Sequence, residues 1–136
     1  MVSGVLSSDV GRIWKNISPL VEKALEYGRG EYLPEDVLEF CTSGSWQMWV
    51  AHDDSGIAAF CTTEITKFPR KKVLLLTLSA GRDFALWKHG KEILKAFASE
   101  KGCDALRGGG RRGWARALGM KPIYEICEEN IGGRYA

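Results

Sequence analysis

The sequence is poor in the residues that build metal centres and disulfide-rich scaffolds. Its 136 residues include only two histidines, and no Cys-x-x-Cys pair occurs among the four cysteines Cys41, Cys61, Cys103 and Cys127. This spacing predicts neither a metal site nor a disulfide framework. Cys61, Cys103 and Cys127 stand in apolar surroundings, which favours reduced core thiols in an intracellular protein.

Long apolar runs and a strong net charge are also absent. No stretch reaches the length that crosses a bilayer, and no apolar run follows a basic N-terminal segment, so we expect a cytoplasmic protein without a signal peptide or membrane association. The 19 Lys and Arg residues nearly balance the 17 Asp and Glu residues, so the composition does not favour nucleic acid as a partner. The 45% hydrophobic content and the length predict one folded domain over residues 1–136.

The clearest pattern that is present lies between residues 73 and 110. Val73–Leu78 is an apolar run typical of a strand buried on both faces. A helical pattern follows over about Phe84–Lys101, Gly102 ends it, and a short strand is expected at Ala105–Arg107. The inward stripe of this helix is expected to contain Leu86, Gly90, Ile93, Leu94 and Phe97. A strand–helix–strand order of this kind predicts two adjacent parallel strands.

The rest of the chain predicts helices first and antiparallel strands after them. We expect a strand at Val2–Leu6, a helix capped by Asp9, a second helix that starts at Ser18-Pro19 and stops at Gly28, a helix from Pro34 to Gly44, strands at Trp46–His52 and Ile57–Lys67, a short helix at Arg111–Leu118, and a last strand at Ile123–Glu128. Together these elements predict an α+β fold with N-terminal helices. Its mixed sheet consists of an antiparallel meander and a parallel strand that is added through the crossover helix.

Several segments are similar to those of the GNAT superfamily of acyl-CoA N-acyltransferases, in particular to a small phage-encoded type. They are SWQMWV after a short helix, a Thr-Glu-rich strand that leads into FPRKK, and then LSAGRDFALW, KAFASEKGCDAL and RRGWARALGM. The resemblance implies that two central strands, here Val73–Ser79 and Ala105–Arg107, splay apart around the pantetheine of an acyl-CoA. It further implies acetyl-CoA or another acyl-CoA as cofactor and a small-molecule or protein amine as acceptor. A phage origin would place the protein in the host cytoplasm or in a virion.

The resemblance also implies which residues bind the cofactor. They are Leu78, Ser79 and Ala80 at the end of the strand, and Trp87, Lys88 and Gly90 on the following helix. When Ile93 and Leu94 anchor the alignment, Gly90 matches the last small residue of the family's phosphate loop. Ala85 and Lys88 then stand where the family has Arg or Gln and Gly. Because small residues let backbone N–H groups close on a diphosphate, this departure predicts weak cofactor binding.

For catalysis, the resemblance points to a carboxylate on a central strand as the general base. Glu64 is the carboxylate that lies deep in a strand pattern before the crossover, so it is the catalytic candidate. Ala115 stands where the family often has an acid tyrosine, with Trp114 beside it. The family's general acid is therefore missing from this sequence.

Three functions stay open at this point. The first is acyl transfer to an amine, and the second is a catalytically inactive GNAT-fold module that binds a partner or belongs to a phage virion or its accessory proteins. The third is nucleic-acid binding through the Arg-Gly segment Arg107–Gly113 together with Arg116. That segment lacks the Gly-Lys-Ser/Thr of a phosphate-binding loop, and a solvated basic helix accounts for it more simply.

Overall fold

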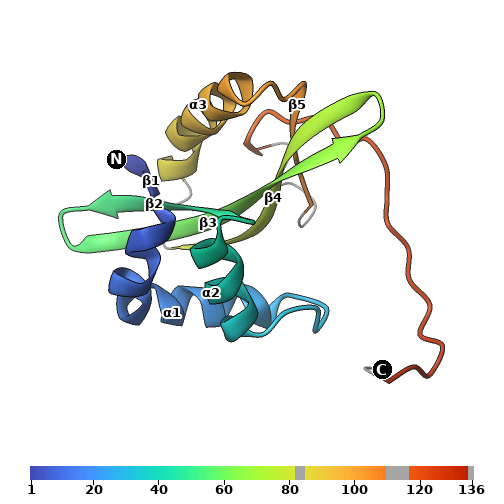
Figure 1. Cartoon of the computed structure of the whole chain (residues 1–136), viewed down its shortest axis with the longest axis horizontal. Helices are drawn as coiled ribbons and strands as arrows, with labels where there is room; N and C mark the ends of the chain where they lie inside the picture. The colour runs from blue at the N-terminus through green and yellow to red at the C-terminus, as the bar shows by residue number, and fades with distance from the viewer. Residues whose placement is uncertain (82–84, 110–116, 135–136) are drawn as a thin grey trace.

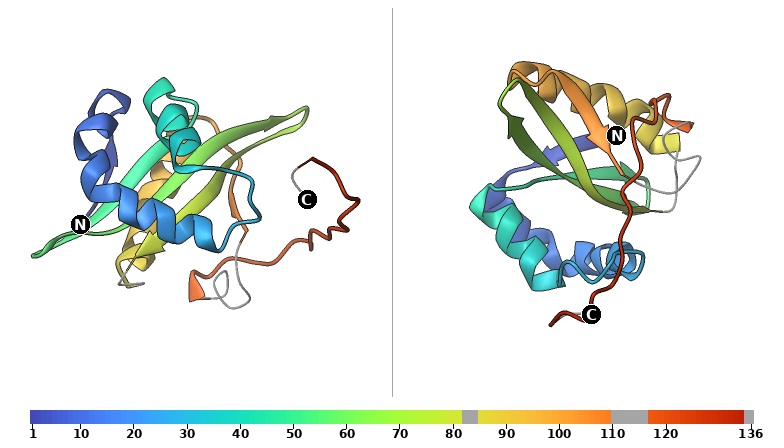
Figure 2. Two further views of the ribbon diagram at one scale, coloured as in Figure 1. Left: turned by 90° about the horizontal axis from the view of Figure 1, so that it is seen from below. Right: turned by 90° about the vertical axis from the view of Figure 1, so that its right-hand side faces the viewer.

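A five-stranded sheet with helices on both faces forms the centre of the molecule (Figure 1). The structure, a computed structural model, describes residues 1–81, 85–109 and 117–134. Its elements are β1 (Val2–Val5), the 3-10 turn η1 (Ser7–Asp9), α1 (Val10–Glu26), α2 (Pro34–Ser43), β2 (Gln47–Asp53), β3 (Gly56–Phe68), β4 (Lys71–Gly81), α3 (Ala85–Glu100) and β5 (Ala105–Gly108). Figure 2 shows α1 and α2 on one face of the sheet and α3 on the other.

The strands follow one another across the sheet in chain order, from β1 to β5. The first four are antiparallel to their neighbours, whereas β5 runs parallel to β4, with Val73 opposite Ala105. The helix between these parallel strands is α3. The predicted α+β fold, with its antiparallel meander, crossover helix and N-terminal helices, is therefore confirmed.

The two faces of the sheet carry separate apolar cores. On the α1 and α2 face, the buried residues are Val10, Ile17, Val21, Ala24, Val37, Cys41, Trp46, Met48, Val50 and Phe60. On the α3 face, they are Trp49, Cys61, Leu74, Leu94 and Ala98, with Ile93 and Phe97 half-buried against them. The apolar stripe predicted for the crossover helix thus faces the sheet, while the side chain of Leu86 lies outside the described residues.

Gly90 brings α3 close to the first strand. A Cβ at this position would lie 2.8 Å from the Trp87 ring and 3.1 Å from Cγ2 of Val2. The inward position expected for this glycine is confirmed, and it serves close packing of the helix against the sheet.

The predicted break between two N-terminal helices is wrong, because α1 continues through Pro19 as one helix. Proline removes one backbone hydrogen bond and costs about 3 kcal/mol inside a helix. The buried stripe of Ile17, Val21 and Ala24 runs across this position, and each large buried side chain contributes roughly 1.5–3 kcal/mol. Burial of that stripe against the sheet therefore outweighs the local cost of the exposed Pro19.

The ends of α1 also differ from the prediction. Asp9 is the residue before the helix, but its side chain makes no capping hydrogen bond and instead lies 3.6 Å from the Arg12 guanidinium. The helix ends at Glu26, and the N–H of Gly28 donates to the carbonyl of Leu25 just beyond it. Gly28 thus follows the last turn without being the stop itself.

The last strand predicted at Ile123–Glu128 is wrong. None of the described residues from 120 to 134 belongs to a helix or strand, and residues 121–134 are exposed. Figure 1 shows this segment passing the β3–β4 hairpin and running away from the sheet. Cys127, expected in the core, is exposed here for the same reason. The predicted helix at Arg111–Leu118 falls largely on residues 110–116, outside the described residues.

Candidate functional site

A β-bulge interrupts β4 near its middle. Thr62 and Thr63 of β3 pair with Leu78 and Leu76, so that Thr77 between them has no partner of its own in β3. The hydroxyl oxygens of Thr62 and Thr77 are 2.7 Å apart and share a hydrogen bond across the bulge. The extra residue reverses the alternation of side chains along β4, because Leu76 packs on the α3 side of the sheet and Leu78 on the α1 and α2 side.

The pairing between β4 and β5 stops where the bulge begins. The last paired residues are Leu76 and Gly108. Residues 77–81 of β4 keep β3 on one side, but among the described residues no strand lies on the other side. Backbone N–H and C=O groups along this edge need partners, and an extended ligand with amide groups can supply them. Ala105–Arg107 is paired with β4 over its whole length, and the open edge of β4 begins where β5 ends.

A small apolar cavity lies beside this open edge, on the α3 face. Its lining residues are Cys61, Leu76, Ser79, Trp87, Lys91, Leu94, Leu106, Leu118 and Met120. The enclosed volume is about 20 Å³, enough for about one water molecule. An acyl chain would therefore need part of the wall to move.

The segment 118–120 forms one part of that wall, with Leu118 and Met120 among the lining residues. Leu118 is buried, and its carbonyl oxygen accepts a hydrogen bond of 2.5 Å from Nζ of Lys91 on α3. Gly119 follows with φ of +71°, which lets the chain turn back over the helix. A hydrogen bond from one charged side chain thus anchors this short segment beside the cavity, and residues 119–120 belong to no helix or strand.

Of the strand residues predicted to bind the cofactor, Ser79 lines the cavity and is exposed. The side chains of Leu78 and Ala80 pack against the core on the other face. Their backbone nevertheless belongs to the open edge of β4. A role for Leu78 and Ala80 would therefore rest on main-chain groups.

Of the helix residues in that prediction, Trp87 lines the cavity and packs against the buried cluster of Val2, Ala51 and Ala59 on the sheet. Lys88 is exposed and does not line the cavity, whereas Gly90 is buried between Trp87 and Val2. The structure thus brings Ser79 and Trp87 together at the cavity. Cofactor binding by all six residues stays a prediction.

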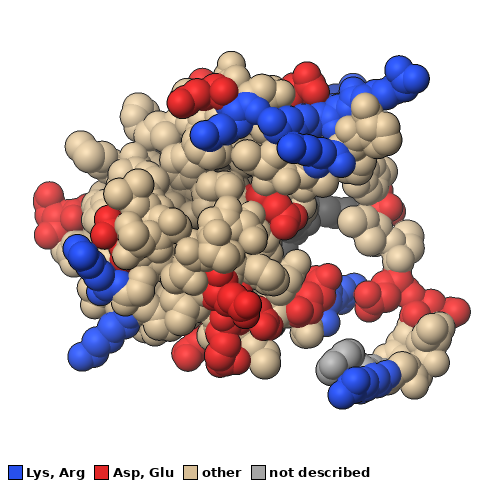
Figure 3. All heavy atoms as spheres, viewed as in Figure 1, with Lys and Arg blue, Asp and Glu red and all other residues tan. Residues whose placement is uncertain are grey.

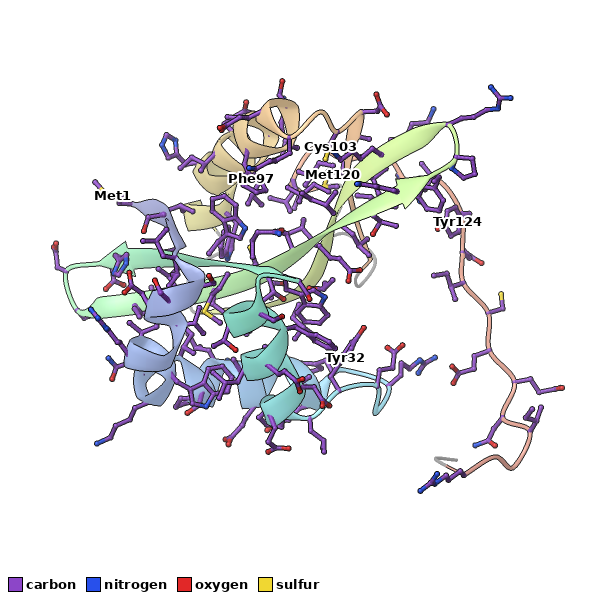
Figure 4. All side chains as sticks on the ribbon, in the orientation of Figure 1. Met1, Tyr32, Phe97, Cys103, Met120 and Tyr124 are labelled. Atoms are coloured by element: carbon purple, nitrogen blue, oxygen red, sulfur yellow. The ribbon has the colours of Figure 1, made fainter. Side chains whose placement is uncertain are left out.

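The catalytic candidate Glu64 lies on the opposite face of the sheet from the cavity. Its Oε2 accepts a hydrogen bond of 3.0 Å from Nε1 of Trp46, on the side of α1 and α2. Trp46 directly precedes β2, so this hydrogen bond holds the carboxylate on the β2 side of β3 and away from β4. Strands β2 and β4 are two strand spacings apart, which is roughly 10 Å. Figure 4 shows Tyr32 and Met120, one from each site, on opposite sides of the sheet.

Aromatic rings and negative charge surround Glu64. The ring of Trp46 contacts those of Tyr32 and Phe40, with centroids 5.1 and 4.9 Å apart. Burial raises the pKa of the Tyr32 hydroxyl, and the negative charges of Glu31 and Glu64 raise it further. This side of the sheet therefore presents a carboxylate beside aromatic rings, an arrangement that attracts cations.

Sequence reasoning missed much of the cavity wall. Lys91 follows Trp87 by four residues, so helical spacing could have placed it on the same face, beside Leu94 of the predicted inward stripe. Nothing in the sequence marks Thr77 as a bulge or brings Leu118 over α3.

Burial raises the pKa of the Cys61 thiol far above its usual range, so this cavity-lining thiol stays protonated and is no nucleophile.

The described residues present neither a metal-binding cluster nor a membrane-spanning helix. Within residues 1–81, 85–109 and 117–134, no three His, Cys, Asp or Glu side chains gather closely enough to hold a metal ion. No helix in that part of the chain combines the length and the apolar character needed to cross a bilayer.

Comparison with known proteins identifies the fold. No protein-family model and no curated protein sequence matches the chain. An aminoglycoside acetyltransferase from an uncultured soil metagenomic sample, solved with sisomicin, matches with a TM-score of 0.71 and 12% identity over 96% of this chain and 93% of that one. A ribosomal-protein-alanine N-acetyltransferase from Brucella melitensis biovar Abortus 2308 matches with a TM-score of 0.71 and 10% identity, over 96% and 99%.

A third structure, a predicted acetyltransferase with acetyl-CoA from Clostridium acetobutylicum, matches with a TM-score of 0.68 and 13% identity over 96% of this chain and 95% of that one. At identities this low, the likeness shows that the fold is shared but does not show a shared activity. Together with the parallel pair of β4 and β5 and the bulge in β4, the matches show that this chain has the fold of the GNAT N-acetyltransferases.

Proposed function

We propose that this protein transfers an acyl group from an acyl-CoA to an amine. The observation that carries the proposal is the open edge of β4 beyond Thr77, which lies beside an apolar cavity between α3 and β5. Likeness to acetyltransferase structures, one of them solved with acetyl-CoA, supports the same reaction class.

The open edge and the cavity suit the two parts of such a donor. The amide groups of a pantetheine arm can pair with the backbone of residues 77–81, while the acyl group enters the apolar wall formed by Trp87, Leu94 and Leu106. A backbone N–H of β4 aimed at the thioester oxygen would stabilise the negative charge that develops there during attack. The amine nitrogen bonds to the acyl carbon, the C–S bond breaks, and the thiolate leaves as CoA after the nitrogen loses its proton.

The closed state of the cavity sets a condition for binding. Its volume of about 20 Å³ is far below the several hundred that a ligand site of drug size encloses. We expect residues 118–120 to swing away, with loss of the hydrogen bond between Lys91 and Leu118. Opening costs free energy and therefore lowers the affinity for acyl-CoA further, beyond the weakening predicted from Ala85 and Lys88.

In this proposal Glu64 acts on the acceptor from the other face of the sheet. Its carboxylate is too distant from the gap to take the proton directly, since Trp46 holds it towards β2. Its negative charge and the neighbouring Tyr32 ring instead favour the approach of a cationic amine. Glu64 would thus draw the acceptor to the site, and water would carry the proton away.

A steady-state assay with acetyl-CoA tests the proposal, with thiol release as the readout. The acceptors are a polyamine, an aminoglycoside and a peptide with a free α-amine. We expect turnover with at least one, and in Glu64→Gln a higher KM for the amine with a smaller change in kcat. Glu39→Gln, on the exposed side of α2, is the matched control and should leave both unchanged.

An inactive GNAT-fold binding module is the second candidate, because the cavity holds room for only about one water molecule and Glu64 lies on the far face. Absence of turnover together with an unchanged melting temperature in acetyl-CoA would favour this candidate. A raised melting temperature would show that the donor binds to the folded protein.

A further inference from the structure

A basic surface surrounds the end of the β3–β4 hairpin, although the net charge of the whole chain is only +2. This hairpin surface contains the basic residues Lys67, Arg70, Lys71, Lys72, Lys101 and Arg107. Figure 3, viewed as Figure 1, shows blue side chains gathered over the hairpin and red ones gathered over α2. The balanced composition thus hides two regions of opposite charge, and the hairpin surface suits a polyanion.

The cations of the hairpin surface have little anionic compensation. Among the described residues, no carboxylate forms an ion pair with Lys67, Arg70 or Lys71. The carboxylate of Asp104 accepts a hydrogen bond of 2.9 Å from the main-chain N–H of Lys72. Lys67 lies directly opposite Lys72 in the pairing of β3 with β4. Like charges at such positions destabilise a sheet, and an anionic ligand would relieve their repulsion.

Arg107 contacts two aromatic rings that are open to solvent. Its guanidinium carbon is 5.3 Å from the centroid of the Phe68 ring and 5.9 Å from that of the Tyr124 ring. Phe68 is 45% exposed and Tyr124 is 63% exposed. Among the described residues, no oxygen accepts a hydrogen bond from this half-buried guanidinium. The two rings therefore restrict the position of its planar fork of N–H donors and leave the donors available, and such a fork matches a phosphate group.

Phosphate groups occur together with flat rings in nucleic acids. An exposed aromatic ring stacks on an unpaired base, whereas the faces of the bases in a duplex are already covered by their neighbours. The rings of Phe68 and Tyr124 thus favour a single strand over a duplex. They also favour it over an anionic membrane or an acidic protein, because neither of these offers a base to stack. Acidic residues, which begin with Glu125, follow Tyr124 and limit the surface on that side.

We propose that the hairpin surface binds single-stranded nucleic acid. Arg107 holds one phosphate through its N–H fork, and the rings of Phe68 and Tyr124 stack on neighbouring bases. The exposed lysines and arginine of the hairpin contact further phosphates. The hairpin lies at the start of β4 and the open edge lies at residues 77–81, towards its end. The proposal therefore stands apart from the acyl-transfer function and does not depend on it.

Fluorescence anisotropy with the full chain tests this binding. The probe is a short fluorescein-labelled DNA single strand at low salt, and the matched probe is an abasic strand with the same number of phosphates. We expect the single strand to bind at least tenfold more tightly than the abasic strand, because only the former has bases to stack. Its affinity should fall as salt rises. Absence of binding to the single strand overturns the proposal, and so does equal binding of both strands. Binding to vesicles of phosphatidylserine and phosphatidylcholine without binding to the single strand would indicate a membrane surface and would likewise overturn it.

A stacking variant shows whether the rings contribute. Tyr124→Leu keeps an apolar side chain but removes one ring, so binding of the single strand should weaken at least fivefold while binding of the abasic strand stays the same. Tyr27→Leu, at a tyrosine 65% exposed outside the hairpin surface, is the matched control and should bind like the wild type. Full binding of the single strand by Tyr124→Leu overturns the stacking role.

A charge reversal shows where the phosphates lie. Lys71→Glu should weaken binding of both strands at least tenfold, because it places a negative charge on the hairpin surface. Lys15→Glu makes the same change of net charge at an exposed position of α1 and should weaken binding less than twofold. Equal losses in the two variants would mean that net charge alone governs binding, and they overturn the proposed surface.

Discussion

Replacing Leu94 with alanine gives the sharpest test of the packing between α3 and the sheet. Leu94 is 2% exposed and belongs to the core cluster with Trp49, Cys61 and Leu74. Truncation of a buried leucine costs 2–5 kcal/mol, and the cost is highest where neighbours cannot move into the space.

Two observations place this site in the upper half of that range. The Trp49 ring cannot shift freely, because its Nε1 donates a hydrogen bond of 3.0 Å to Oγ1 of Thr63. Leu74 belongs to β4, which is paired on both sides at that point. The space left by Leu94→Ala would therefore persist and add to the cavity already there. We expect a loss of roughly 3–4 kcal/mol.

Urea unfolding followed by tryptophan fluorescence measures this loss of free energy of unfolding. In a thermal melt, Tm should fall by roughly 10–15 °C. Leu94→Met keeps the volume and should cost less than about 1.5 kcal/mol. Leu6→Ala, at a leucine 69% exposed, should cost less than about 0.5 kcal/mol. A loss below about 1 kcal/mol for Leu94→Ala would mean that α3 does not pack on the sheet as described.

Three further predictions concern Gly81, Cys41 and the predicted phosphate loop. Gly81→Ala should destabilise the protein by roughly 1–3 kcal/mol in thermal melts, because the new Cβ would lie 2.3 Å from that of Ala59; an unchanged Tm would argue against this pairing. Burial raises the pKa of the Cys41 thiol to about 12, so the unfolded thiol ionises first and stability should fall as pH rises from about 8.5 towards 12. Cys41→Ala should show a shallower fall, and an equal fall would refute the reasoning. Ala85→Arg with Lys88→Gly should tighten acetyl-CoA binding at least tenfold by calorimetry, and no gain would show that the phosphate-loop alignment is mistaken.

The part of the fold that the sequence predicts best is the unit from β4 to β5. The apolar run, the helical stripe and the stop at Gly102 can each be read from neighbouring residues. Together they predict a strand–helix–strand crossover with two adjacent parallel strands. The break expected at Pro19 fails because tertiary burial outweighs a local preference. The strand expected at Ile123–Glu128 fails for a related reason, since a strand requires a neighbour that sequence patterns cannot supply.

The candidate site is less visible in the sequence. Trp87 and Ser79 were expected at a cofactor site from a family resemblance, and the structure places both at the cavity. The bulge at Thr77 has no residue signature, because many side chains adopt that backbone. Contact between Lys91 and Leu118 joins residues 27 apart, and pairing over such a separation emerges only from the folded chain.

In the proposed function, an acyl-CoA binds at the open edge of β4. Calorimetric titration of acetyl-CoA into the wild type and into Ser79→Trp tests it most directly, because an indole at this exposed, cavity-lining position would block the entrance. Ser3→Trp, on the exposed face of β1, is the matched control. We expect measurable binding by the wild type and by Ser3→Trp, and at least a tenfold loss in Ser79→Trp. Equal binding by all three proteins, or none by the wild type, would mean that acyl-CoA does not bind at this edge.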